Sequence, residues 1–324
     1  MEMMLENDWG EFEKGMDLSR GMYVQSIAHI SKSMKRNLSM NNHDYSALKP
    51  FLRWAGGKSK LVKTLVDFVP PSNSYDRYFE PFVGAGALFF HIGPSKAVLS
   101  DLNTDLINCY QQVAKHPEGV WNLLQVHREF NNKEYYYHIR SQKPEKLKPI
   151  EQAARFIYLN KAAFNGIYRV NRQGVFNVPY GPSFKGPALP KKSLIEAASG
   201  LLKRVNLLAA DYQEVCESAK RDDFIYLDPP YPPTNGTAYF THYTADRFNW
   251  DDQREVSKVF QNLDRRGCLV MMSNSDRKEI RSMFQGYYMQ QLNVTRWIGS
   301  NGDRFKAHEI IVTNYNPSEF RNGD

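Results

Sequence analysis

The sequence predicts an α/β protein with a Rossmann-like sheet and an inserted helical domain. Short apolar runs that end at glycines or acids occur on both sides of the chain's middle, as expected of strands in an open α/β sheet. Between them, residues 104–203 carry apolar side chains at three- and four-residue spacing, which favours helices. The 324 residues suffice for a large core and two domains. We expect residues 47–103 and 204–324 to form the sheet domain and 104–203 the helical one.

Composition narrows the class of protein. Residues 1–46 mix Met, Ser, Asn and charged residues without periodicity, which predicts a poorly ordered extension. No apolar run approaches the roughly 18 residues of a membrane helix, so no membrane partner is expected. Cys109, Cys216 and Cys268 lie far apart and predict neither a disulfide framework nor a zinc site. This cysteine usage fits a reducing cytoplasm.

The charge of the chain points to a polyanionic partner. Its formal net charge is +7 and its isoelectric point is near 9.1. Eight basic residues and only Glu196 as an acid fall between residues 161 and 204. This concentration makes nucleic acid the leading candidate. The eight are Lys161, Arg169, Arg172, Lys185, Lys191, Lys192, Lys203 and Arg204.

The first organised segment contains the glycine turn Gly56-Gly57-Lys58-Ser59. A phosphate-binding loop would need glycine at position 52, where Leu52 stands, and a preceding strand, which is not predicted. We expect the glycines instead to allow close backbone approach to a ligand, with Trp54 as a flat wall and Lys58 as a charge. The alternative is a plain turn before a helix over 59–68.

A strand, a glycine turn and a helix are predicted over residues 78–90. Gly84 and Gly86 match the start of the dinucleotide fingerprint, but Phe89 occupies the position of its third glycine. A second strand, 97–100, ends at Asp101, where an acid can bind ribose hydroxyls. The expected ligand is a nucleoside without pyrophosphate, and S-adenosylmethionine fits. The alternative is an α/β unit that binds nothing.

The middle of the chain predicts helices over 104–115, 117–130 and 150–163. A loop follows these helices, and a hairpin and loop are expected over 174–190. In that region Arg169 can present a bidentate fork to guanine, Asn165 and Asn171 can bond base edges, and Phe164 can wedge into a base stack. The alternative is a solvated basic loop.

Alternation of strands and helices resumes after residue 204. A strand over 207–210 leads to Asp211 and Tyr212, which suit an adenine amine and its ring face. A helix over 250–263 and strands over 268–273 and 309–313 are also predicted.

The strand 224–227 ends at Asp228-Pro229-Pro230-Tyr231. Ligands of open α/β sheets bind at the carboxyl ends of strands, and two prolines hold the adjacent carbonyls rigidly. Asp228 and the Pro229 carbonyl can accept the two hydrogens of an exocyclic amine, while Tyr231 stacks on the ring that carries it. The alternative is a turn that ends the strand with an incidental acid.

In this order, these stretches resemble the Dam-type (D12 class, α group) DNA adenine-N6 methyltransferases. The resemblance covers residues 50–316 and implies a seven-stranded S-adenosylmethionine-dependent methyltransferase sheet with a helical target-recognition domain. It also implies a bacterial or phage-encoded enzyme of the cytoplasm that acts on duplex DNA, usually at GATC. The matching segments are 54–58, 80–86, Asp101, 164–169, 176–181 and 228–231.

Roles follow from the resemblance position by position. S-adenosylmethionine would be bound by Trp54, Lys58, Phe82, Asp101, Asp211 and Asp228. Asp228, Pro229 and Tyr231 would hold a flipped adenine. Arg53, Phe164, Asn165 and Arg169 would contact DNA, Arg53 and Arg169 at guanines. The family often has lysine in place of Arg53 and tyrosine in place of Phe164, and both replacements keep the charge or the aromatic ring.

The implied reaction is a direct methyl transfer to N6 of a flipped adenine, which needs neither a metal nor a covalent cysteine. Two other classes stay open: a cytosine-N4 methyltransferase with a similar tetrapeptide, and a non-enzymatic DNA-binding protein. Two biological settings also stay open, a solitary enzyme and one that protects DNA from a cognate restriction endonuclease.

Overall fold

The computed structural model describes residues 48–54, 56–166, 168–171, 173–181, 186–232, 248–297 and 304–320. The extension predicted over 1–46 lies outside these residues. None of the helices in the described ranges has the length and apolar character needed to cross a membrane.

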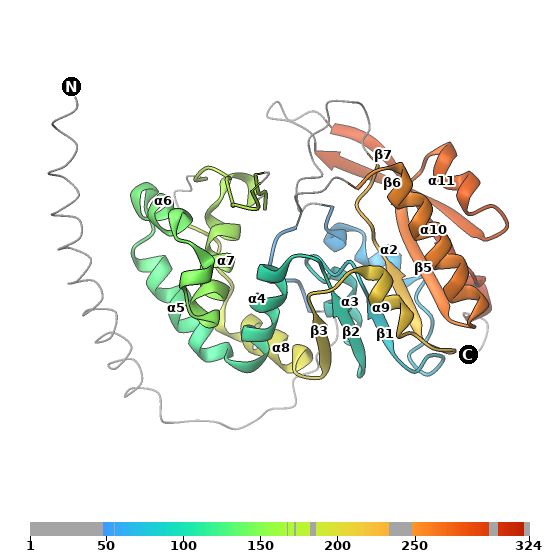
Figure 1. Ribbon diagram of the computed structural model, residues 1–324, viewed down its shortest axis with the longest axis horizontal. Coiled ribbons are helices and arrows are strands. Elements are labelled where there is room, and N and C mark those ends of the chain that lie inside the picture. Colours follow the sequence, from blue (N-terminus) through green and yellow to red (C-terminus); the bar gives the residue numbers. More distant parts are fainter. Residues whose placement is uncertain are drawn as a thin grey trace, which may run out of the picture. The chain divides into compact units, whose positions relative to one another are not determined.

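A seven-stranded sheet runs through the protein in the order β3-β2-β1-β4-β5-β7-β6 (Figure 1). The first five strands of that order are parallel, and β7 is antiparallel to both its neighbours. The predicted α/β fold class is confirmed. Along the chain the strands are β1 (Tyr78–Glu80), β2 (Ala97–Ser100), β3 (Val205–Leu208), β4 (Phe224–Leu227), β5 (Leu269–Ser275), β6 (Tyr288–Trp297) and β7 (Arg304–Thr313).

The strand order reverses between β1 and β4. From β1 the chain builds outward through β2 and β3, and β4 then pairs with the other side of β1. Open α/β sheets bind ligands at such a switch point, outside the carboxyl ends of the strands. The segments that follow β1, β2 and β4 all meet at this edge of the sheet, so the topology brings residues 80–86, Asp101 and 228–231 to one region.

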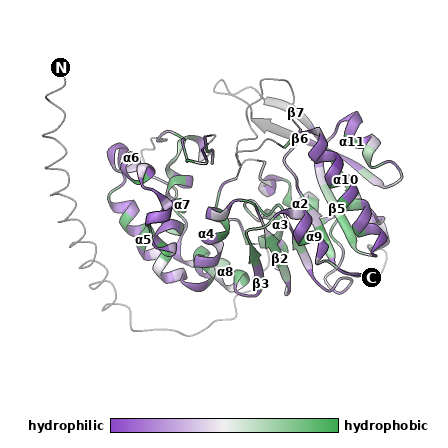
Figure 2. Ribbon diagram, viewed as in Figure 1, coloured by the Kyte–Doolittle hydropathy of each residue, from purple (hydrophilic) through white to green (hydrophobic). Residues whose placement is uncertain are grey.

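Helices α9 (Tyr212–Glu217), α10 (Trp250–Arg265) and α11 (Lys278–Met283) cover one face of the sheet (Figure 1). Ile225 and Leu227 of β4 point into the core on that face, while Phe224 packs against Tyr78 toward the other. Both faces of the parallel strands are therefore apolar, and the sheet appears green in Figure 2 between largely purple helix surfaces.

The helical insertion lies beside the β3 edge of the sheet (Figure 1). Gln111 Nε2 donates to the Leu207 carbonyl over 3.2 Å, and Ser199 Oγ donates to the Ala114 carbonyl over 3.0 Å. Helix α4 thereby attaches the insertion to β3, and α8 is bonded to α4 within the insertion. The helices are α4 (Thr104–Lys115), α5 (Pro117–Glu129), α6 (Lys133–Ser141), α7 (Pro149–Ala162) and α8 (Lys192–Leu202).

The three predicted helices of the insertion are confirmed within one residue as α4, α5 and α7. Asn103 begins α4 because its side chain accepts a hydrogen bond from the Leu106 amide over 2.9 Å. A hairpin is present, but it begins ahead of the predicted range 174–190: a bridge joins Val170 to Phe176, and residues 182–185 lie outside the described part of the chain. The helices α6 and α8 were not predicted.

Several predicted bounds were wrong. The strand expected over 309–313 is the longer β7, which begins at residue 304, and the strand expected over 268–273 is β5, which ends at Ser275. The helix expected over 59–68 is a 3₁₀ turn, Lys58–Lys60, followed by the short α2 (Val62–Val66). The strand expected over 207–210 begins and ends two residues earlier, as β3. Asp211 caps α9 through its side chain, so the chain has to leave the sheet before that residue.

Candidate active site

Asp228 is the centre of the site and follows β4 directly. Lys58 Nζ lies 2.6 Å from its Oδ1 and 2.7 Å from its Oδ2, and Ser273 Oγ donates to Oδ1 over 2.7 Å. Burial raises the pKa of Asp228, and the charge of Lys58 and the bonds from Lys58 and Ser273 oppose that rise. The site therefore holds a desolvated carboxylate with cationic and hydroxyl partners.

Lys58 reaches Asp228 from the segment that precedes α2. Its side chain is 4% exposed, its Nζ also donates to the Gly56 carbonyl over 2.9 Å, and the amine lies 4.8 Å from the centre of the Tyr231 ring. The sequence predicted Lys58 as a cofactor residue. The structure brings it to the carboxylate and the ring of the tetrapeptide that was predicted to be catalytic.

Glu80 is a second buried carboxyl near Asp228, at the end of β1. Tyr78 donates its hydroxyl to Glu80 Oε2 over 2.8 Å. Burial raises the pKa of Glu80 to about 8, and the Asp228 charge adds to the rise while the Tyr78 bond opposes it. Glu80 is therefore protonated at neutral pH. Sequence reasoning assigned it no role of its own, although its place inside the glycine motif was a signal.

The glycine turn after β1 brings Trp54 and Asp101 together. Gly84 has a φ of +45° and donates its amide to Asp101 Oδ2 over 3.1 Å. A Cβ on Gly84 would lie 2.8 Å from Trp54 Cδ1, so only glycine lets the indole come this close. Burial raises the pKa of Asp101 to about 6, opposed by the amides of Asn103 and Gly84.

Phe82 and Asp211 lie on two neighbouring turns. Phe82 stacks on Tyr212 with ring centres 4.8 Å apart, and its edge faces Phe248 at 6.2 Å. Asp211 Oδ1 accepts from the Gln213 amide over 2.8 Å. The predicted cofactor residues thus frame the carboxyl ends of β1, β2 and β3, with one oxygen of Asp211 occupied by its helix cap.

The remainder of the tetrapeptide is held by polar side chains that sequence reasoning missed. Tyr231 donates its hydroxyl to Glu309 Oε2 over 2.8 Å, and Gln253 Nε2 donates to the Pro230 carbonyl over 2.8 Å. Their partners come from β7 and α10, far away in the sequence. The run Ser273-Asn274-Ser275 at the end of a predicted strand was the only sequence signal for this shell.

Arg53 connects the glycine segment to the helical insertion. Its amide donates to Asn160 Oδ1 over 2.9 Å, and Asn160 Nδ2 donates back to the Arg53 carbonyl over 2.7 Å. A Cβ on Gly166 would lie 2.3 Å from Arg53 Cδ, so the arginine side chain crosses this glycine. Burial and the charge of Arg53 lower the pKa of Lys161 to about 8.

The other predicted DNA contacts, Phe164, Asn165 and Arg169, follow α7. Phe164 is 49% exposed, and Asn165 adopts a left-handed backbone with a φ of 56°. Arg169 is exposed, and its Nε donates to Asn177 Oδ1 over 2.9 Å across the hairpin. The structure groups these three on one loop and hairpin, and it brings none of them into hydrogen-bonding contact with Asp228.

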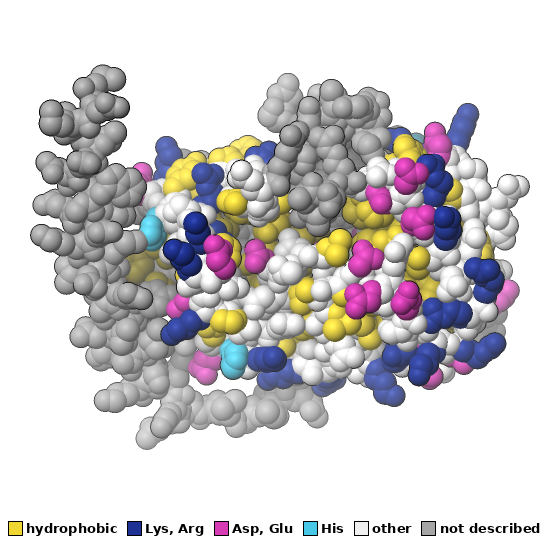
Figure 3. All heavy atoms as spheres, viewed as in Figure 1, with side chains coloured by type: hydrophobic (Ala, Val, Ile, Leu, Met, Phe, Trp, Pro, Cys, Tyr) yellow, Lys and Arg dark blue, Asp and Glu magenta, His cyan; other side chains and the backbone are white. Residues whose placement is uncertain are grey.

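Trp54 forms a bridge between the two groups of candidates. Its indole stacks on Tyr168 with ring centres 5.1 Å apart, one residue before Arg169. On the face shown in Figure 3, Lys and Arg side chains are spread over both the insertion and the sheet region and are interspersed with acids. Charge alone therefore does not mark one DNA-binding surface on that face.

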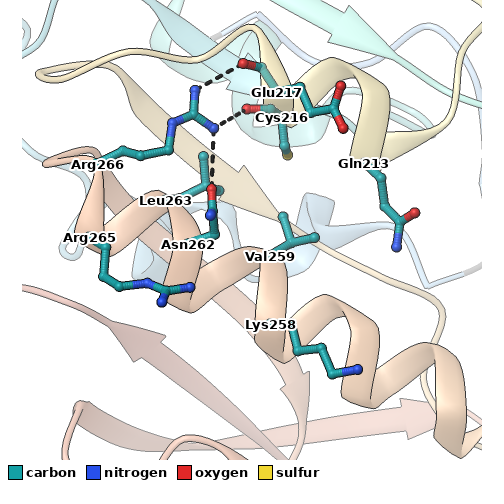
Figure 4. Close-up of a pocket in the computed structure, with 9 residues that line it drawn as sticks. All are labelled: Gln213, Cys216, Glu217, Lys258, Val259, Asn262, Leu263, Arg265 and Arg266. Atoms are coloured by element: carbon teal, nitrogen blue, oxygen red, sulfur yellow. Dashed lines mark hydrogen bonds between the residues drawn. The ribbon is translucent and has the colours of Figure 1, made fainter.

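A pocket of about 370 Å³ lies between α9 and α10, away from these residues (Figure 4). Arg266 is one of its lining residues and donates to the carbonyls of Cys216 over 3.0 Å and Glu217 over 2.9 Å. None of the residues that line it is among the predicted site residues. We do not assign the reaction to it. Among the described residues, no group of three or more His, Cys, Asp or Glu side chains could hold a metal.

Comparison with known families decides the family of the chain. The model of the D12 class N6 adenine-specific DNA methyltransferases matches residues 54–298. The chain belongs to this family. The alternatives of a cytosine-N4 enzyme and of a non-enzymatic protein are therefore set aside, and DNA and a methyl donor are its substrates.

The matches to curated relatives cover almost the whole length of each relative. A type II methyltransferase of Lactococcus lactis subsp. cremoris is 40% identical over 83% of this chain and 96% of the relative. A type II methyltransferase of Methanocaldococcus jannaschii is 35% identical over 83% and 99%. A DNA adenine methylase of Vibrio cholerae is 35% identical over 82% and 95%.

Proposed function

We propose that this adenine-N6 methyltransferase takes its methyl group from S-adenosylmethionine and acts on the adenine of GATC in duplex DNA. The observation that carries the proposal is Asp228, a largely buried carboxylate (17% exposed) at the switch point of the sheet, held by Lys58 and Ser273. Residues 47–103 and 204–324 would form the catalytic domain, and 104–203 the target-recognition domain.

The residues around Gly84 fit the proposed donor. An adenosyl group needs a flat apolar wall, an acceptor for ribose hydroxyls and close backbone approach. Trp54 and Phe82 supply aromatic faces, Asp101 supplies the acceptor, and Gly84 supplies the close approach. Bound S-adenosylmethionine would supply a methyl group on a sulfonium, which is already activated for transfer.

Asp228 and Pro229 would act on the target amine. The N6 lone pair of adenine is delocalised into the ring, so the amine is a poor nucleophile. An ionised Asp228 and the Pro229 carbonyl accept its two hydrogens, which favours a pyramidal nitrogen and stabilises the positive charge that grows on it. The charge of Lys58 and its bond to Asp228 oppose the rise in the pKa of Asp228 that burial causes, which favours the ionised form.

Tyr231 would stack on the flipped adenine. Extrusion of a base from the duplex costs a few kcal/mol, part of which stacking on an aromatic ring offsets. The Tyr231 hydroxyl bonds Glu309, which fixes the ring that would receive the base. The ring is therefore preorganised before the base arrives.

Sequence recognition would come from the loop and hairpin after α7. Arg169 is exposed and bonded to Asn177, so its guanidinium can be presented as a fork to a guanine edge. Phe164 is half-exposed and can fill the stack, Asn165 can bond a base edge, and Arg53 can reach an outer guanine. Matches to both type II methyltransferases and DNA adenine methylases support the reaction without favouring a restriction–modification setting.

Labelled methyl transfer to two duplexes tests the proposal. We expect labelling of a duplex that contains GATC and none when that site is GTTC. Equal labelling of both would refute the GATC target, and no labelling of either would refute the proposed donor.

Asp228→Ala tests the assignment of the centre. We expect loss of methyl transfer with DNA affinity and thermal stability retained, because Asp228 contributes a charge that the reaction needs. A variant that is as active as the parent would sink this assignment.

A further inference from the structure

We infer that Gln253 and Asn274 are positioning residues that aim the Pro229 carbonyl at the target amine. This inference rests on the proposed function of segment 228–231. A chain of side-chain hydrogen bonds carries it. Gln253 Nε2 donates to the Pro230 carbonyl over 2.8 Å, and Asn274 Nδ2 donates to Gln253 Oε1 over 2.9 Å.

Both amides are buried. Gln253 on α10 is 1% exposed, and Asn274 on β5 is 0% exposed. Buried side-chain amides are costly unless their polar atoms are bonded, and here they bond one another and the backbone. Burial of this Gln–Asn pair therefore costs free energy that its hydrogen bonds must offset. Outside β5, the backbone group that the pair bonds is the Pro230 carbonyl of the Pro–Pro turn.

The hydrogen bonds of this chain can run in one direction only. The Ser275 amide, which can only donate, bonds Asn274 Oδ1 over 2.8 Å. Asn274 must therefore turn its Nδ2 to Gln253, whose Nε2 is then directed to the Pro230 carbonyl, which can only accept. The two ends fix the orientation of both amides.

The geometry of Pro230 links the direction of its own carbonyl to that of the Pro229 carbonyl. Two backbone angles of Pro230 separate its carbonyl from that of Pro229, and the Pro230 ring locks one of them. The bond from Gln253 fixes the other by anchoring the Pro230 carbonyl. The direction of the Pro229 carbonyl is then set from α10 and β5.

Neighbouring positions hold the rest of the tetrapeptide. Ser273 bonds the Asp228 carboxylate, and Glu309, which faces Ser275 across the β5–β7 pair, bonds the Tyr231 hydroxyl. The carboxyl end of β5 and its β7 partner thus form one platform for both amine acceptors and the stacking ring.

Gln253→Met and Asn274→Asp test the inference. Methionine keeps the length of the side chain without a donor. Aspartate keeps the acceptor for Ser275 but turns the Gln253 amide toward itself, away from Pro230. Gln261→Leu, at an exposed position of the same helix, is the matched control.

We expect the single-turnover rate constant of methyl transfer to fall by about 10- to 100-fold in both variants. KM for DNA and for S-adenosylmethionine should stay within about twofold of the parent. Loss of structure would instead lower the amplitude of the single turnover and leave its rate constant unchanged. Gln261→Leu should behave as the parent.

Two outcomes separate the inference from the proposed function. If Asp228→Ala abolishes transfer but Gln253→Met and Asn274→Asp keep the parent rate constant, the inference is wrong and the proposed centre stands. If Asp228→Ala keeps full activity, the proposed centre itself fails. A lower single-turnover amplitude with an unchanged rate constant in both Gln253→Met and Asn274→Asp would also overturn the positioning role.

Discussion

At the scale of single residues, Asp228 has to remain ionised in surroundings that favour its neutral form. Burial raises its pKa, and Lys58 is the largest influence in the opposite direction. Methyl transfer needs the carboxylate, so the rate should fall as pH decreases through this raised pKa. Lys58→Met should raise the pKa of Asp228 further.

The acid limb of the pH–rate profile should therefore move to higher pH in Lys58→Met, measured by single turnover at saturating S-adenosylmethionine. Lys60→Met, at an exposed lysine two residues away, is the control and should leave the limb in place. An unmoved limb in Lys58→Met would contradict the electrostatic role of Lys58.

Glu80 should make the protein less stable as pH rises. Its pKa is about 8 in the folded chain against 4.5 for an ordinary glutamate, so the unfolded chain binds fewer protons between these values. The contribution of Glu80 to the free energy of unfolding is fully present below pH 4.5 and is lost as the pH rises through about 8. At its steepest the loss approaches about 1.4 kcal/mol per pH unit.

The interval from pH 6.5 to 7.5 suits the measurement, because the opposing effect of Lys161, whose pKa burial lowers to about 8, grows above it. Asp101, with a pKa of about 6, is largely titrated below it, and His127 has its pKa lowered to about 3 by burial, so that its opposing effect ends near pH 6.5. Urea unfolding in this interval should show a falling free energy that Glu80→Gln flattens. Glu129→Gln, at an exposed position, should not flatten it.

At the scale of elements, the 3₁₀ turn Phe164–Gly166 after α7 leaves room at Gly166 for the Arg53 side chain. Gly166→Ala would put a Cβ 2.3 Å from Arg53 Cδ and 2.8 Å from its Nη1. We expect the guanidinium to be displaced, and discrimination between GATC and duplexes altered at the outer guanine to fall by about tenfold, the usual worth of a good base contact.

Gly174→Ala is the matched control for this substitution. Gly174 has a φ of +76°, close to the +63° of Gly166, but a Cβ there meets nothing within 4 Å. Both alanines therefore carry similar backbone strain, and only one meets Arg53. Competition binding with variant duplexes would measure the difference, and equal loss of discrimination in both would mean that strain, not Arg53, is responsible.

The elements that the sequence predicted correctly are those with strong local signals. The α4 helix has a capping asparagine and a regular apolar stripe, and β4 is a short apolar run with a proline stop. In contrast, α6 contains three consecutive tyrosines, α8 contains an internal glycine, and most of the described β6 side chains are exposed or half-buried. The formation of these three elements depends on tertiary contacts, which the local sequence pattern does not reveal.

The site could be predicted where one stretch of chain carries it. Asp228, its prolines and Tyr231 are adjacent in the sequence. Glu309 and Gln253, which hold them, come from elements 78 and 23 residues away. Only the tertiary fold reveals such partners, because it places β5 beside β4, β7 beside β5, and α10 against the same part of the sheet.

At the scale of the whole molecule, the net charge of +7 should govern non-specific affinity. Each phosphate neutralised releases a counterion, so the logarithm of the binding constant should fall linearly with the logarithm of salt concentration, by about 0.9 per phosphate. GATC and GTTC duplexes should show parallel slopes, because base contacts contribute little to the slope.

Fluorescence titrations between low and physiological salt would measure both slopes. A salt-independent affinity would contradict a phosphate-driven interaction. Slopes that differ strongly between the two duplexes would show that GATC binding recruits additional phosphate contacts.

The reciprocal bonds between Asn160 and the Arg53 backbone join positions 107 residues apart, one in the insertion and one ahead of the glycine turn. They bear on how target preference can be exchanged between relatives. A cassette cut at residues 103 and 204 would carry Asn160 without the segment that it grips. A working chimera should instead transfer residues 51–54 together with 104–203, so we expect the module that changes specificity to be discontinuous in the gene.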